Sequence, residues 1–379
     1  MESEFIAMSS AGEEANWLRS MLIDIPLWGK PIPPLTIYCD NKAAIFLSSS
    51  DCYNGKSRQV CLKHNHMRIL LEDGIISLQY VKSKLNLADP LSKGLDRELM
   101  GILINGQFPG PTLNVVTNDN VIVTVINKLD DPLLITWNGV KQRKSSWQDG
   151  VVGTNCPIPP NSQWTYKMQM KVQIGTFTYF PSTLMHRAAD GFGGINILAR
   201  SVIPIPYPKP FEQFTLLVSD WWKTDNKVLQ QILDQGQDFP FPDALHINGR
   251  PNSLKFTGMK GYAYLFRVSN VGLTASINVR IQGHTLKLVE VEGSHTMQEV
   301  YESLDIHVGQ SMAFLVTLHA NPKDNIVAST RFTKPILTVT AILHYQGSNI
   351  PASKPLPVGP TYQVQWSMKQ ARTIRYIYM

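Results

Sequence analysis

The chain has 379 residues, of which 43% are hydrophobic and 17% charged, a composition typical of globular proteins and not of disordered ones. This length allows two or three domains, each with its own core. Residues 1–99 contain 11 basic and 12 acidic residues, whereas residues 100–379 contain 24 and 17. Because the basic residues form no dense run, we do not expect nucleic acid as a partner.

Two further features bear on cellular location. Four cysteines are too few for a disulfide framework in a chain of this length. The N-terminal sequence MESEFIAMSSAGEEANWL lacks the basic and apolar regions of a signal peptide, and no apolar run reaches 18 residues. From the sequence as written we expect no membrane span and a cytoplasmic location.

Residues 1–99 alternate between helical and strand patterns. The periodicity predicts helices over 2–23, about 42–47, 57–72 and 87–95, and strands over 35–39 and 75–81. The segment resembles the C-terminal part of the RNase H domain of copia-type retrotransposons. The matching stretches are SEFIAMSSAGEEANWL, IYCDNKAAI and YNGKSRQVCLKHNHMRILLEDGIISLQYVKSKLNLADPLSKGL.

The RNase H resemblance implies a carboxylate site that holds magnesium ions across a scissile phosphate. Glu4, Asp40 and Asp89 match three of those carboxylates, whereas the first aspartate and its strand have no counterpart after Met1. Two strands seldom form a stable sheet without their central neighbours. We therefore expect a partial α/β segment whose carboxylates are vestigial.

A second cluster in this segment has metal-like residue types. Cys61 and His64 are three residues apart and share one face of the expected helix, but His66 points away from His64. The three side chains cannot converge while the helix holds, so we expect ordinary helix-surface residues and not a metal site.

From Gly101 onward the pattern changes to short alternating strands separated by turn residues, which predicts Greek-key β-sandwiches. The predicted strands cover residues 114–116, 121–127, 163–170, 176–180 and 195–200, and then 214–218, 263–268, 277–281, 286–291, 304–308, 313–318, 325–329 and 337–345. A proline-rich linker at 204–210 divides a domain over 101–203 from a second over 210–350. One helix is expected at 227–235. The fold class is therefore mainly β, with two β-sandwiches behind a partial α/β segment.

The second part of the chain carries several unusual motifs: GILINGQFPGPT, TWNG, SWQDG, TNCPIPP, FPSTLMHRAADGFGG, SDWWKTD, VEVEGSH and GPTYQVQWSMKQARTIR. Together they resemble the plant monocopper-oxidase-like (SKS) family, which includes the pollen ascorbate oxidase homologues, over residues 101–375. This resemblance implies cupredoxin-like domains, an extracellular location and a role in the cell wall.

The same resemblance bears on copper. Where multicopper oxidases have the copper-binding histidines of two motifs, this sequence has Thr136, Asn138, Phe180 and Ser182. Hydroxyl, amide and phenyl groups do not replace imidazole as copper ligands. We expect no bound copper, no other cofactor and no catalysis. His186, His284 and His295 lie off the ligand spacing and are expected to be core, turn or surface residues.

Our preferred interpretation is a non-catalytic cell-wall or pollen-type cupredoxin protein fragment in a chimaeric chain. Its first sandwich lacks the opening strands, and residues 351–379 comprise a linker and the start of a third domain. The resemblance implies a cell-wall polymer or protein as partner. Three alternatives remain: a copper-binding oxidoreductase, a retrotransposon-derived RNase H remnant, and a chimaera without coherent function.

Overall fold

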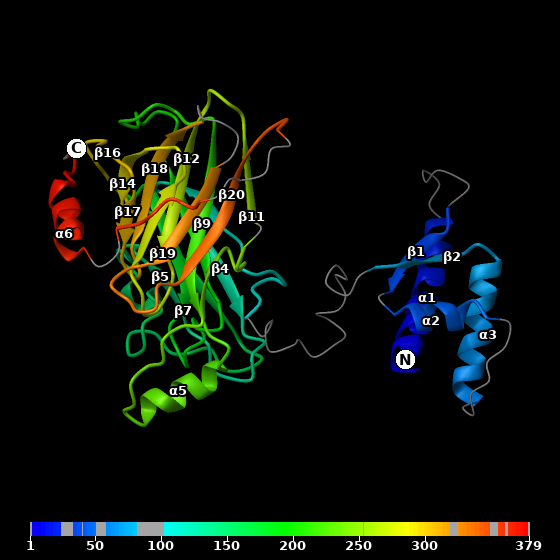
Figure 1. Cartoon of the computed structure of the whole chain (residues 1–379). Helices are drawn as coiled ribbons and strands as arrows, with labels where there is room; N and C mark the ends of the chain where they lie inside the picture. Colours follow the sequence, from blue (N-terminus) through cyan, green and yellow to red (C-terminus); the bar gives the residue numbers. More distant parts are fainter. Residues whose placement is uncertain are drawn as a thin grey trace. The chain divides into compact units, whose positions relative to one another are not determined.

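We describe a computed structural model of the chain, over residues 2–23, 33–39, 41–50, 58–81, 102–252, 254–318, 324–348, 355–360 and 363–377. The chain divides into two compact units, residues 1–96 and 97–379 (Figure 1). No described helix is long and apolar enough to cross a membrane.

The first unit contains three helices and two parallel strands among its described residues. These elements are α1 (Glu2–Ile23), β1 (Leu35–Cys39), α2 (Lys42–Ser48), α3 (Arg58–Glu72) and β2 (Ile76–Tyr80). Strand β1 pairs with β2 in register from Leu35 opposite Ile76. The predicted elements over 2–81 are thus present, whereas the helix predicted over 87–95 lies outside the described residues.

An apolar face of α1 builds the small core of this unit. Phe5 and Met8 are buried against Met67 and Leu70 of α3, as the spacing of α1 predicts. Leu18, further along the same helix, is 39% exposed. The likeness of this segment to RNase H stays a prediction.

The second unit is mainly β and contains two sandwiches. The first combines the sheet β3-β8-β7-β5 with the pair β4-β6. Its strands are β3 (Leu113–Val116), β4 (Asn120–Ile126), β5 (Ile135–Asn138), β6 (Gln163–Gln169), β7 (Gly175–Pro181) and β8 (Gly193–Leu198). Strand β5, which the alternation did not predict, carries two of the candidate copper positions.

The second sandwich is larger and packs two full sheets face to face. One sheet follows the order β10-β9-β12-β18-β14-β15 with β16 beside β14, and the other the order β11-β20-β19-β13-β17. The first sheet contains β9 (Glu212–Trp221), β10 (Ala244–Ile247), β12 (Ala263–Asn270), β14 (Leu286–Val291), β15 (Ser294–His295), β16 (Val300–Tyr301) and β18 (Ser311–Thr317). The second contains β11 (Leu254–Gly258), β13 (Ile277–Ile281), β17 (Leu304–Ile306), β19 (Asp324–Thr330) and β20 (Thr338–Tyr345).

Two helices accompany this second sandwich. Helix α5 (Asn226–Asp234) starts at Asp225, whose carboxylate accepts from the Lys227 N–H, and is followed by Gly236 with a φ of 70°. Helix α6 (Val364–Thr373) lies near the C-terminus and packs on β17. The expectation that residues 351–379 open a third domain stays a prediction.

Candidate functional site

The site is built on the antiparallel pair β5 and β7 of the first sandwich. In its register Thr136 lies opposite Phe180, and Asn138 lies opposite Thr178. Ser182 follows directly after β7. The four candidate positions, which are up to 46 residues apart in sequence, therefore meet at one edge of the sheet.

The carbonyl of Gly150 joins two of these side chains. It accepts hydrogen bonds from the Thr136 Oγ1 at 2.8 Å and from the Ser182 Oγ at 2.7 Å. Asp149 shapes the loop beside it, because its Oδ1 accepts from the Val151 N–H and the Thr154 hydroxyl. The two hydroxyls are thus committed to holding this loop on β5 and β7.

Gly150 must be glycine for this arrangement. Its φ is 74°, and a Cβ added there would lie 1.7 Å from the Ile135 carbonyl oxygen. Both the left-handed backbone and the close approach to β5 exclude a side chain. The motif SWQDG therefore places one backbone carbonyl against the strand that carries Thr136.

Asn138 connects the two sandwiches. Its Nδ2 donates to the Gly309 carbonyl of the second sandwich at 2.9 Å and, at 3.3 Å, to the Thr178 hydroxyl. The hydrogen bond to Gly309 joins two residues that are 171 positions apart in sequence. The amide nitrogen of Asn138 thus helps to fix the interface between the sandwiches.

Phe180 is covered by a cation. The Arg187 guanidinium lies 3.9 Å from the centre of the Phe180 ring, and it donates to the carbonyls of Val271 and Gly272 at 2.8 Å each. Burial lowers the pKa of Arg187 to about 10, and Asp220 partly opposes this change. A positive charge so near this position works against binding of a metal cation.

Acidic side chains lie buried beside this cation. Burial raises the pKa of Asp190 to about 8, Ser219 lowers it, and the charge of Asp220 raises it further. The Asp220 Oδ2 accepts from the backbone N–H groups of Leu273 and Thr274. These carboxylates were not predicted as site residues, although Asp220 stands inside the motif SDWWKTD.

The histidines near and beyond the site occupy structural positions. His186 is 2% exposed, and burial lowers its pKa. His284 is buried, with its ring nitrogens 2.9 Å from the Gln282 carbonyl and the Tyr345 hydroxyl. His295 is half-buried against the ring of Tyr207. Within the described ranges, no group of three or more His, Cys, Asp and Glu side chains could hold a metal ion.

The candidate residues of the first unit were only partly located. Asp40, Asp89 and the side chain of Glu4 lie outside the described residues. The expectation that Cys61, His64 and His66 are surface residues is wrong for His64, which is 1% exposed. Its Nε2 lies 2.9 Å from the Leu47 carbonyl, because α3 turns this face towards α2.

A buried ion pair also joins the two sandwiches. Glu290 of β14 lies 3.1 Å from Arg267 of β12, and its Oε1 accepts from the Thr176 N–H of β7 at 2.6 Å. Arg267 donates further to the Thr176 hydroxyl and to Gln213. The motif VEVEGSH contains Glu290, but its alternation gave no indication that this carboxylate is buried.

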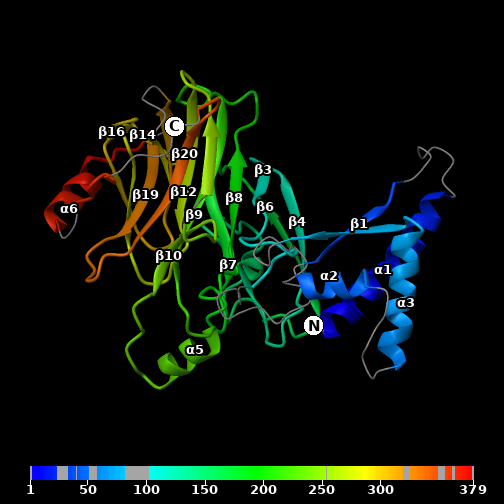
Figure 2. The same ribbon diagram turned by 45° about the vertical axis from the view of Figure 1, so that its right-hand side comes forward.

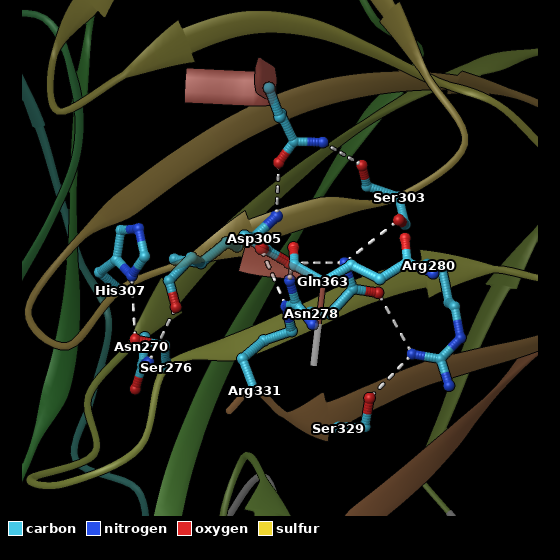
Figure 3. A network of polar contacts seen from close by, with 12 residues as sticks. Asn270, Ser276, Asn278, Arg280, Ser303, Asp305, His307, Ser329, Arg331 and Gln363 are labelled. Carbon is cyan, nitrogen blue, oxygen red and sulfur yellow. Dashed lines mark hydrogen bonds and ion pairs between the residues drawn. The ribbon is translucent and has the colours of Figure 1, made fainter. Parts of the chain in front are cut away.

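A second polar network anchors α6 (Figure 3). Asp305 of β17 pairs with Arg331 at 2.9 Å and accepts from Asn278 at 2.8 Å. Gln370 of α6 binds the edge of β17 twice, since it accepts from the Asp305 N–H and donates to the Ser303 carbonyl, both at 2.8 Å. One side-chain amide thus satisfies two backbone groups of an edge strand.

Comparison with known proteins identifies this arrangement. Two domain models described as multicopper oxidase match residues 92–201 and 212–348. The chain is 47% identical over 286 residues to an L-ascorbate oxidase homolog of Nicotiana tabacum, covering 73% of this chain and 52% of that protein. It is also 47% identical over 296 residues to the monocopper oxidase-like protein SKU5 of Arabidopsis thaliana, covering 73% and 50%.

Solved structures agree with these matches. The laccase of Botrytis aclada is 25% identical with a TM-score of 0.60, and the match covers 68% of this chain and 51% of that one. The multicopper oxidase Fet3p is 24% identical with a TM-score of 0.60, covers 68% and 50%, and shows the fold alone. The chain spans about half the length of the curated relatives it matches. Through residues 92–201 and 212–348, the chain belongs to the multicopper oxidase family.

Proposed function

We propose that this chain is a copper-free, non-catalytic protein of the plant ascorbate oxidase homologue and SKS type. The observation that carries the proposal is the use of the candidate ligand positions for internal contacts. The hydroxyls of Thr136 and Ser182 bind the Gly150 carbonyl, and Asn138 binds the second sandwich. These side chains use their hydrogen-bond donors for contacts within the protein, and none of them is an imidazole or a thiolate, so they do not fit a copper centre.

The chemistry of the side chains supports the same conclusion. Copper in proteins favours imidazole and thiolate ligands. The four positions supply two hydroxyls, an amide and a phenyl ring, and the phenyl ring of Phe180 is covered by the Arg187 guanidinium. Such a set can hold a loop and an interface together, but it offers a redox metal no donor of the preferred kind.

The proposed organisation follows the sequence interpretation. Residues 101–203 and 210–350 form two cupredoxin-like domains, and residues 351–379 a linker with the start of a third. Residues 1–99 are a partial RNase H-like segment, so that the chain as a whole is a chimaera. By resemblance, the partner is a cell-wall polymer or a cell-wall protein, and the location of the family is extracellular.

Copper content tests the proposal. The purified chain is incubated with excess Cu(II), desalted, and its copper measured by elemental analysis. We expect substoichiometric copper, and a variant with Thr136→His, Asn138→His, Phe180→His and Ser182→His to retain more. Stoichiometric copper in the unmodified chain, lost on His186→Gln, would show that a different ligand set holds the metal and would overturn the proposal.

A further inference from the structure

A large cavity lies at the junction of the two sandwiches, away from the candidate site. Its volume is about 900 Å³, and its walls come from β3 and β8 of the first sandwich, the linker after β8, and the start of β9 with β12 in the second. These strands lie side by side in Figure 2. Cavities of this size at domain junctions are common binding sites for small molecules.

Beside apolar side chains such as Ile174, Leu198 and Leu265, the wall of the cavity carries a chain of neutral polar groups. Buried Asn196 of β8 donates to the Asn114 Oδ1 at 3.1 Å and to the Thr215 hydroxyl oxygen at 3.2 Å. These bonds use the acceptor oxygen of Asn114, and its Nδ2 has no acceptor among the described residues. The Gln213 Nε2 likewise has no acceptor among the described residues. The Oε1 of the same amide accepts a hydrogen bond from Arg267.

Charged side chains line the mouth of the cavity. Arg200 and Lys209 are exposed, and within the part of the chain that the structure describes neither forms an ion pair. Arg200 uses its Nε to donate to the Thr117 carbonyl at 3.2 Å, so its terminal nitrogens stay available. Glu212 is the only carboxylate among the described residues that line the cavity, and Arg267 is neutralised by Glu290.

The neutral wall therefore offers free donors on Asn114 and Gln213 and a free buried acceptor, the Asn196 Oδ1, which has no hydrogen-bond partner among the described residues, and the mouth carries two cations against one carboxylate. Such a lining is complementary to a negatively charged ligand whose hydroxyl groups both accept and donate hydrogen bonds. We propose that this cavity binds a hydroxylated organic anion of mono- or disaccharide size, with its acid group towards Arg200 and Lys209. The polar chain from Asn114 to Thr215 then receives the hydroxyls.

Calorimetric titration of the full chain tests this site. The probes are D-glucuronate, D-glucose 6-phosphate, D-glucose and inorganic phosphate. We expect either organic anion to bind more tightly than glucose, and its affinity to fall as salt is raised. The stronger of the two identifies the acid group as a carboxylate or a phosphate. Equal binding of glucose, or no binding of either anion, overturns the proposal. Inorganic phosphate that binds as tightly as glucose 6-phosphate overturns it too, because the neutral wall would then contribute nothing.

Matched variants locate the binding. The double substitution Arg200→Gln with Lys209→Gln should weaken anion binding at least about tenfold, the effect of losing two facing charges. Lys255→Gln with Lys260→Gln changes the net charge equally on exposed residues outside the cavity lining and should leave the affinity within about twofold. Glu212→Gln should strengthen binding. Equal losses in the two double variants, or weaker binding after Glu212→Gln, would contradict the assignment. Because none of these residues touches the candidate copper positions, the outcome is independent of the copper experiment.

Discussion

The ion pair between Arg267 and Glu290 offers a quantitative test of how the two sandwiches are held together. Both side chains are at most 3% exposed, and Glu290 also accepts from the Thr176 N–H of the first sandwich. In Glu290→Gln the shape is kept, but an amide N–H faces the guanidinium and the buried positive charge loses its partner. Breaking a buried pair in this way costs about 3–5 kcal/mol.

Urea unfolding followed by tryptophan fluorescence measures this cost. With a slope of about 3 kcal/mol per molar urea, the midpoint should fall by about 1 M. Replacing both partners, as Glu290→Gln with Arg267→Met, should recover part of the loss because no unpaired charge remains. The exposed control Glu299→Gln should stay within about 0.5 kcal/mol. A loss for Glu290→Gln no larger than for this control would refute the reasoning.

Three further predictions concern single positions. Gly150→Ala should cost at least about 2 kcal/mol in unfolding free energy, because it adds left-handed strain and a Cβ 1.7 Å from the Ile135 carbonyl oxygen; an unchanged unfolding midpoint would contradict the close approach. The folded pKa of Asp190, about 8, lies above its ordinary value of 3.8, so folding takes up a proton and stability falls as pH rises between about 4 and 8. Asp190→Asn cannot ionise, and its melting temperature relative to the unmodified chain should therefore rise from pH 5 to pH 9; a pH-independent difference would rule this out. Gln370→Leu removes both bonds to the edge of β17 and should speed proteolysis within residues 363–377, whereas exposed Lys369→Leu should not; equal rates would argue against the edge contact.

Much of the strand pattern could be predicted from the sequence alone. Alternation of apolar and polar residues over β4, β6 and β13 and over most of β14 follows directly from a face that must be buried. Strand β5 was not predicted because it has only four residues, and the loop that follows ends its alternation of apolar and polar residues. Short strands of this kind adopt an extended conformation because they pair with a neighbouring strand, in this case β7.

The side chains at the candidate copper positions were likewise given by the sequence, as Thr136, Asn138, Phe180 and Ser182, and so was the absence of imidazole from these four positions. Their present roles were decided by tertiary structure. Only pairing of β5 with β7 brings Thr136 and Ser182 to the Gly150 carbonyl, and only the packing of one sandwich on the other brings Asn138 to Gly309. The same holds for Arg267 and Glu290, which lie on two strands of one sheet separated by β18. A strand pattern shows which face is buried but not which charged side chain of another strand will lie beside it. The functional group at each position is specified by the sequence. Its hydrogen-bond or ion-pair partner is set by contacts between residues that are distant in sequence.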